Sequence, residues 1–199
     1  MSRKTSAVIR IVTWSLLAVF LIGILTIGLK GGSFFNFHLP FTGFNGSFGY
    51  ANSEEYTVGG GAVDMEGVQD IELNWNSGNV NITSYDGSQI TFDETSQRSL
   101  EEDQRMRYLV KNGKLTIQFC APYRNFGFWN ANIPDKTLEM KVPKALAGSL
   151  KEFEVSGVSA AIHADGISAQ KLVVDNVSGS SVLTNIQADT LAMDTVSGE

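Results

Sequence analysis

The sequence predicts an all-β protein, a β-solenoid or β-helix-like fold of 19-residue repeats preceded by one N-terminal transmembrane helix. Three observations support this prediction. An uncharged apolar run lies near the N-terminus, the C-terminal segment repeats itself at a fixed interval, and the composition favours turns. The 199 residues include 20 Gly against 4 Pro, a balance that indicates many turns rather than long soluble helices.

The apolar run spans residues 11–29 and reads IVTWSLLAVFLIGILTIGL. At ~1.5 Å per residue it is ~28 Å long, close to the ~30 Å hydrocarbon core of a bilayer. Three basic residues precede the run and only Lys30 follows it closely, so the N-terminus is expected in the cytoplasm. We therefore expect residues 1–10 to be a short cytoplasmic tail and the run to be the signal anchor of a single-pass cell-membrane protein. A cleaved signal peptide is the alternative, although no A-x-A site follows the run.

Residues 30–57 are expected to be a linker rich in Phe and Gly, because no period of 2 or 3.6 residues persists there. Six phenylalanines are unusual for a spacer: Phe34, Phe35, Phe37, Phe41, Phe44 and Phe48. They fit either contact with the headgroup layer or a partner protein, or a low-complexity spacer whose first rings merely lie at the membrane interface. We favour the spacer. The remaining residues, 58–199, are expected to form one extracytoplasmic β-solenoid domain.

The repeat appears when three rows are aligned: FEVSGVSAAIHADGISAQK, LVVDNVSGSSVLTNIQADT and LAMDTVSGE, which begin at Phe153, Leu172 and Leu191. No gap is needed to align them. Within a row, apolar residues alternate locally as in a half-buried strand, and Ser-Gly and Asn turns interrupt the alternation. Short strands, small turns and a fixed period near twenty are typical of β-solenoid coils. A helical leucine-rich repeat fits less well, because the rows lack its leucine spacing.

A single row cannot fold alone. It buries about five or six apolar side chains at ~1.5–3 kcal/mol each, whereas ordering its backbone costs ~1–2 kcal/mol per residue. Stacking offsets this cost, because neighbouring rows share ladder hydrogen bonds and apolar contacts. We therefore expect like residues to lie side by side, Leu172 beside Leu191, with a glycine or alanine at the tight corner after Ser178.

The N-terminal part of the domain repeats the same interval. Ile71 precedes Ile90 by nineteen residues, and Asn-Ser-Gly at 76–78 resembles the corner at 177–179. These matches are an echo of the repeat in the N-terminal half of the domain.

Other elements follow in order. The polar stretch 94–106 is expected to be a loop or short helix. Asn-Gly at 112–113 predicts a hairpin between strands at 108–110 and 115–117. A strand at 137–142 then leads into the repeats.

Taken in order, IELNWNSGNVNITSYDGSQITF, YLVKNGKLTIQF, LEMKVPKAL and the repeated VSG rows resemble the DUF4097 family over roughly residues 63–199. The resemblance implies a bacterial cell-envelope protein with a β-strand-repeat domain, often behind an N-terminal membrane helix. Members are labelled adhesins by analogy, and the resemblance implies no catalytic or binding residues. Members usually continue through further rows, whereas this chain stops mid-row at Glu199. We therefore expect either a fragment or a partner that covers the open end.

No motif predicts an enzyme, and we expect no catalytic residues, no metal and no cofactor. A G-x-S-x-G elbow, an H-E-x-x-H pair and a phosphate-binding loop are all missing. A Ser–His–acid set would need His163, which aligns with a valine inside the repeat. Asp175 and Asp194 share a column that could hold Ca²⁺, but Ser156 breaks the column, so we interpret both as solvated turn residues. Cys120 is expected to be a small buried apolar residue.

The aromatic segment at 118–136, QFCAPYRNFGFWNANIPDK, is the best candidate for an interaction site. Long aromatic loops either bind partners or cover exposed sheet edges, and we favour the cover. As a binding site, the segment would stack on sugar rings of the envelope. The candidate interaction residues are Tyr123, Arg124, Phe126, Phe128 and Trp129.

The net charge of −6 argues against nucleic acid as a partner. We expect a membrane-anchored, non-enzymatic adhesion or scaffold module of the bacterial cell envelope. Its expected partners are cell-wall glycan or another envelope protein, with self-association through the open solenoid end. The alternative is an envelope-stress sensor or regulatory ectodomain that acts through a membrane partner. An enzyme acting on polysaccharide ranks third, because it would need carboxylates clustered along one face.

Overall fold

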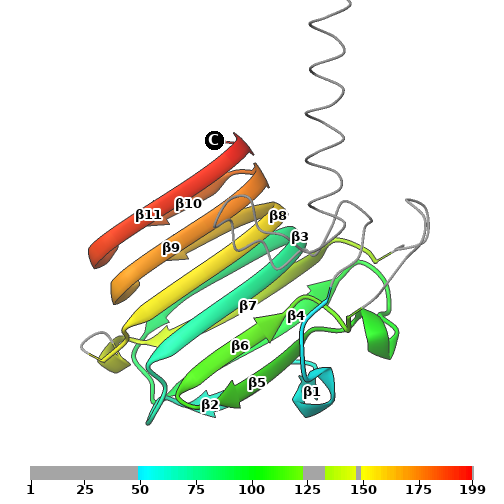
Figure 1. Ribbon diagram of the computed structural model, residues 1–199, viewed down its shortest axis with the longest axis horizontal. Coiled ribbons are helices and arrows are strands. Elements are labelled where there is room, and N and C mark those ends of the chain that lie inside the picture. Colours follow the sequence, from blue (N-terminus) through cyan, green and yellow to red (C-terminus); the bar gives the residue numbers. More distant parts are fainter. Residues whose placement is uncertain (1–48, 123–132, 147–148, 199) are drawn as a thin grey trace, which may run out of the picture.

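The computed structural model describes residues 49–122, 133–146 and 149–198 of the chain. Within them the protein is all-β, as predicted, and its strands form one strongly curled mixed sheet (Figure 1). The elements in chain order are η1 (Ser53–Glu55), β1 (Thr57–Val58), β2 (Gly61–Asp64), β3 (Asp70–Tyr85), β4 (Gln89–Ser96), η2 (Glu102–Gln104), β5 (Arg107–Lys111), β6 (Lys114–Gln118), β7 (Lys136–Pro143), η3 (Lys144–Leu146), β8 (Glu152–Asp165), β9 (Ser168–Gly179), β10 (Ser181–Thr184) and β11 (Gln187–Gly198).

The long strand β3 is the centre of the sheet. Before Gly78 it pairs in parallel with β6, and from Gly78 onward it pairs in parallel with β7. Strand β8 runs parallel to the other side of β3 along both of these parts. Strands β3 and β8 therefore belong to two arms of the sheet, which meet at a corner beside Gly78.

Each arm has its own strand order. The first arm runs β1–β5–β6–β3–β8–β9–β11, and the second runs β2–β4–β7–β3–β8–β10. Figure 1 shows the C-terminal strands, from β8 to β11, stacked beside β3. Apolar side chains from both arms, such as Trp75 and Ile82, belong to one buried core. The core therefore depends on the corner that joins the arms.

Parallel pairing places like residues side by side in columns. One column of the first arm crosses β6, β3, β8, β9 and β11 through Leu115, Ile71, Phe153, Leu172 and Leu191. The first four of these side chains are fully buried, whereas Leu191 is half exposed. Burying each of the four contributes ~1.5–3 kcal/mol. The columns are therefore a main source of stability, and they stay open at β11.

Close backbone approach shapes the corner. The φ angles of Gly78 and Gly179 are +94° and +129°, in a region that residues with side chains rarely adopt. An added Cβ would lie 2.1 Å from the Lys136 carbonyl oxygen at Gly78, and 2.2 Å from the Ala160 carbonyl oxygen at Gly179. A neighbouring carbonyl thus occupies the space that a side chain would need, so glycine is required at both positions.

Side chains also bind these corner carbonyls. Trp75 Nε1 donates to the Lys136 carbonyl at 3.4 Å, and Asn176 Nδ2 donates to the Ala160 carbonyl at 2.8 Å. Trp75 and Asn176 each stand three residues before the corner glycine of their strand, and both lie in register with Gly157. A buried carbonyl without a donor costs ~1–3 kcal/mol. Trp75 and Asn176 therefore both donate a hydrogen bond to a corner carbonyl, each in its own row.

The nineteen-residue interval is confirmed in the C-terminal rows. Strands β8, β9 and β11 pair with partners nineteen residues apart, and Leu172 lies beside Leu191 as predicted. The echo of this interval in the N-terminal part does not reflect stacking, because Ile71 lies beside Leu115 and Phe153 and not beside Ile90. After the bend at 86–88, β4 runs antiparallel to β7 and β2 instead of starting a new parallel row. Rows nineteen residues apart thus make up only the C-terminal portion of the sheet, although β3 also pairs in parallel with β6, β7 and β8.

The other predicted elements are present. The hairpin at 112–113 joins the antiparallel strands β5 and β6, with both turn residues at positive φ. The strand at 137–142 lies within β7, and the polar stretch 94–106 contains η2 after the end of β4. Gly78 lies in register with Ala160, so the predicted corner at 76–78 is confirmed.

The expected membrane anchor at 11–29 lies outside the described residues, as does the linker up to residue 48. In the part of the chain that the structure describes, no helix is both long enough and apolar enough to span a bilayer. The anchor therefore stays a prediction from the sequence.

Replacing Gly78 with alanine is expected to destabilise the fold by about 2–5 kcal/mol. The left-handed conformation costs ~1–2 kcal/mol for a residue with a side chain, and overpacking against the Lys136 carbonyl adds ~1–3 kcal/mol. The matched control is Gly67→Ala, where φ is +85° and an added Cβ would meet no atom within 4 Å. Only the conformational cost is expected there. Urea unfolding of both variants measures the difference, and equal losses would contradict the close approach at the corner.

Candidate functional site

A groove of about 490 Å³ opens over the second arm, where β2, β4 and β7 lie side by side. Its lining combines glycine backbone, a hydroxyl group and charged side chains, beside the buried Phe92. The lining residues are Gly60, Gly61, Thr91, Phe92, Asp93, Glu139 and Lys141.

Two glycines shape this groove. At Gly60 an added Cβ would lie 2.6 Å from Asp93 Oδ1, and at Gly61 it would lie 3.0 Å from the Tyr108 ring. The chain entering β2 therefore lies directly against β4 and Tyr108. On the core side of β4, the Phe92 and Tyr108 rings pack edge to face with centroids 4.8 Å apart, a favoured aromatic geometry.

The charged groups of the groove belong to neighbouring strands. Asp93 on β4 lies directly opposite Glu139 on β7, an arrangement in which like charges repel. Asn81 Nδ2 donates to Glu139 at 2.6 Å, and the Glu94 backbone N–H donates to Asp93 at 2.9 Å. Lys141 stands two residues after Glu139 on the same strand. The groove therefore presents two adjacent carboxylates and one ammonium group to a ligand.

This arrangement suits binding better than catalysis. Glycosidases keep one carboxyl group protonated by burying it, and set the pair on either side of the bond that breaks. Asp93 and Glu139 are both exposed, and they stand side by side on one face. Such groups can hydrogen-bond the hydroxyl groups of sugars and attract an amine.

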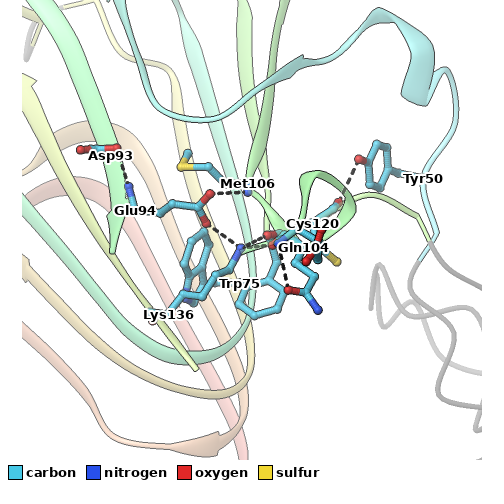
Figure 2. Close-up of polar contacts among 10 residues, drawn as sticks. Tyr50, Trp75, Asp93, Glu94, Gln104, Met106, Cys120 and Lys136 are labelled. Carbon is cyan, nitrogen blue, oxygen red and sulfur yellow. Dashed lines mark hydrogen bonds and ion pairs between the residues drawn. The ribbon is translucent and has the colours of Figure 1, made fainter. Parts of the chain in front are cut away.

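A buried lysine joins several elements beside the second arm (Figure 2). The Lys136 side chain is 0% exposed, and its Nζ lies 2.7 Å from Glu94 Oε2. The same nitrogen donates to the Gln104 carbonyl at 2.8 Å and to the Phe119 carbonyl. It also lies 4.1 Å and 5.1 Å from the ring centroids of Phe119 and Trp75. The ammonium group thus donates two hydrogen bonds to carbonyls and forms an ion pair with the Glu94 carboxylate.

The Lys136 ion pair has a structural role. Burial lowers the pKa of Lys136, and the Glu94 carboxylate opposes this shift. Glu94 Oε1 in turn accepts the Met106 backbone N–H at 2.7 Å. The pair therefore ties β7 and β4 to the segment around η2 and to the end of β6.

Cys120 is confirmed as a buried residue. Its side chain is fully buried at the end of β6, and Tyr50 Oη donates to its carbonyl at 3.0 Å. Burial raises the pKa of the Cys120 thiol to about 12. The thiolate, which is the reactive form, is therefore scarce at neutral pH.

The candidate interaction residues of the aromatic segment lie outside the described residues: Tyr123, Arg124, Phe126, Phe128 and Trp129. Both interpretations of this segment, a cover and a binding site, therefore stay predictions. The described residues on its two sides are held together, because the Lys136 ammonium lies over the Phe119 ring.

Asp175 and Asp194 lie in register, as predicted, but in strands β9 and β11 rather than in turns. Burial raises the pKa of Asp175, and the Asp194 carboxylate adds to this shift. Among residues 49–122, 133–146 and 149–198, no group of three or more His, Cys, Asp or Glu side chains is placed to hold a metal ion. His163 is exposed on β8 and lies in register with Val182, as the alignment predicted.

Sequence reasoning missed the groove and the buried ion pair. The signal for the pair was present, because Lys136 shares the inward parity of Leu138 and Met140 in the alternating strand KTLEMKVP. The groove had no comparable signal. Asp93 and Glu139 are 46 positions apart, and only the antiparallel register of β4 and β7 brings them together.

Two comparisons with known proteins found similarity to this chain. A family model described as Toastrack DUF4097 matches residues 68–199 of the chain. No curated protein matches the chain. Among solved structures, it is similar to one from Clostridium sporogenes described as a "putative cell adhesion protein". The two chains are 12% identical with a TM-score of 0.40, and the likeness covers 72% of this chain and 100% of that one.

Replacing Lys136 with methionine is expected to cost ~3–5 kcal/mol of unfolding free energy, because it leaves the Glu94 carboxylate buried without its counter-charge. The double variant, Lys136→Met with Glu94→Gln, should lose less unfolding free energy than the two single variants lose combined. The expected coupling is ~1–3 kcal/mol. Urea unfolding of the two single variants and the double variant measures this coupling. Strictly additive losses would show that the two side chains do not stabilise one another.

Proposed function

Because the chain belongs to the DUF4097 Toastrack family, we propose that it is a membrane-anchored, extracytoplasmic β-repeat protein of the bacterial cell envelope. It serves there as a non-enzymatic adhesion or scaffold module. The apolar run at 11–29 supplies the anchor, and the excess of basic residues before it keeps the N-terminus in the cytoplasm. The sheet then stands outside the membrane as a rigid unit.

The groove over the second arm is the observation that favours a binding role. Asp93, Glu139 and Lys141 bring hydrogen-bonding and charged groups to one concave surface. Cell-wall glycans carry many hydroxyl groups and, on amino sugars, amine or amide groups. We propose that this surface holds such a glycan, because carboxylates and an ammonium group can bond to both kinds of substituent.

The architecture favours a passive role over an enzymatic one. The buried charges Lys136 and Glu94 are used to join structural elements. The parallel C-terminal rows act as a short β-solenoid, in which each row stabilises its neighbours. A stack of this kind presents a regular, stiff surface, which suits attachment or assembly.

The second candidate is a sensor of envelope stress that signals through a membrane partner. It is supported by the uncharged apolar run at 11–29, which can contact a partner within the membrane. In this case the transmembrane run itself recognises the partner.

The groove is tested with the full chain and purified cell-wall sacculi. Replacing Asp93→Asn and Glu139→Gln together is expected to weaken binding at least about tenfold, because charge-assisted hydrogen bonds contribute ~1.5–3 kcal/mol each. The matched control changes two exposed carboxylates away from the groove, Glu54→Gln and Glu66→Gln, and should bind as the original chain does. Equal binding by both variants, or no binding by the original chain, would contradict the glycan role.

Exchanging the transmembrane run separates adhesion from sensing. An adhesion or scaffold module should keep its activity when residues 11–29 are replaced by an unrelated apolar helix, because the sheet makes the contacts. The measurement compares attachment to sacculi and the envelope-stress response in cells that carry either version. A lost stress response with intact attachment would favour the sensor.

A further inference from the structure

The outer face of the first arm carries more carboxylates than cations. Side chains that alternate with the buried core residues of β6, β3, β8 and β9 lie on this face. Its charged groups include Lys114, Lys171, Glu72, Glu152, Glu154 and Asp175. Each of the two lysines is already paired, Lys114 with Glu72 and Lys171 with Glu152. The face therefore has carboxylates left over.

Glu154 and Asp175 are the carboxylates that concern us. Within the described residues, neither side chain forms a hydrogen bond or an ion pair. Glu154 lies directly beside Glu72 of β3, an arrangement in which like charges repel. Burial raises the pKa of Glu154, and the Glu72 carboxylate adds to this shift. A cation beside Glu154 and Asp175 would relieve this unfavourable arrangement.

A buried hydroxyl group lies between these carboxylates and lacks a partner. Ser156 is in register with Asp175 of β9, and it stands two residues after Glu154 on the same face of β8. The Ser156 side chain is only 2% exposed, and its Oγ has no hydrogen-bond partner. Buried polar groups are nearly always hydrogen-bonded, so an orphaned hydroxyl beside two unpaired carboxylates indicates a missing ligand.

The three side chains can reach one atom. Adjacent strands lie ~4.8 Å apart and each residue advances ~3.3 Å along a strand, so the most distant two, Glu154 and Asp175, start within about 8 Å of each other. Both are half-buried, which leaves their carboxylates within reach of solvent. Val173 lies beside Glu154 on β9 and adds an apolar surface to the same place.

This set of groups suits a primary ammonium better than other cations. A primary ammonium has three N–H donors, and the site offers three acceptors. A quaternary ammonium has no N–H to give to the Ser156 hydroxyl. Calcium requires six or more oxygen ligands, and in the described part of the chain no three acidic, His or Cys side chains are placed to hold a metal ion.

We propose that Glu154, Ser156 and Asp175 bind a primary alkylammonium group, each side chain accepting one of its N–H donors. The carbon chain of the ligand lies against Val173. The group belongs to a free alkylamine or to a lysine-type side chain of a peptide, which present the same chemistry. This inference does not rest on the glycan role, because the proposed glycan groove lies over the second arm.

An NMR titration of the full chain in detergent with butylammonium tests the site. The amide signals of Glu154, Ser156 and Asp175 are expected to shift, and butyltrimethylammonium, which has the same charge but no N–H, should bind at least about tenfold more weakly. Equal binding of the two probes would show attraction by charge alone and would contradict the proposal. Failure of butylammonium to shift these signals would also overturn it.

Two variants test the assigned acceptors. Ser156→Ala and Glu154→Gln are each expected to weaken butylammonium binding about tenfold, because each removes a hydrogen bond to a charged group. Both changes remove an unfavourable group, so thermal unfolding should occur at the same temperature or higher. The matched control is Glu66→Gln, an exposed carboxylate between β2 and β3, which should bind as the original chain does. Unchanged binding by either site variant would contradict its assigned role.

A third probe, Nα-acetyl-lysine methylamide, distinguishes the two sources of the amine. It carries the same ammonium group on a side chain flanked by peptide bonds. Binding at least as tight as that of butylammonium assigns the site to a peptide-borne amine, and weaker binding assigns it to a free alkylamine.

Discussion

The structure depends on the close approach of backbones at the corner of the sheet. Carbonyl groups of neighbouring strands point into the space where Gly78 and Gly179 lack a side chain. Trp75 and Asn176 then donate to these carbonyls from equivalent positions in their rows. Because every row turns at the same place, the two arms stay aligned along the stack. The apolar columns of both arms can therefore share one core, although no single row could bury enough surface alone.

The same corner determines what surrounds the core. Strand β7 begins there. The Lys136 carbonyl accepts a hydrogen bond from Trp75 at the corner, and the Lys136 ammonium group reaches Glu94, Gln104 and Phe119. One residue thus joins the stacked rows to the antiparallel strands. Those strands in turn bring Asp93 opposite Glu139 and open the groove over the second arm. The binding surface that we propose is therefore held by rigid strands rather than by loops.

The sequence predicted the repeating part of the fold better than the rest. The rows that begin at Leu172 and Leu191 match position by position, because parallel stacking requires like residues in register. The match between Ile71 and Ile90 was misleading. Alternating apolar residues recur in any strand, and the periodicity does not reveal that β4 runs antiparallel to β7. The groove could not be predicted for the same reason, since its residues meet only through long-range pairing. The burial of Lys136 could have been inferred from its parity, but a lysine is usually exposed.

The central claim is that successive rows lie in register, nineteen residues apart, within one column. Methyl NOE spectroscopy of leucine-labelled protein tests it most directly, with Leu172→Val and Leu191→Val used to assign the signals. Adjacent strands are ~4.7–4.9 Å apart, so the account predicts a strong cross-peak between the methyl groups of Leu172 and Leu191. Absence of this cross-peak, with Leu191 instead in contact with residues of another column, would contradict it.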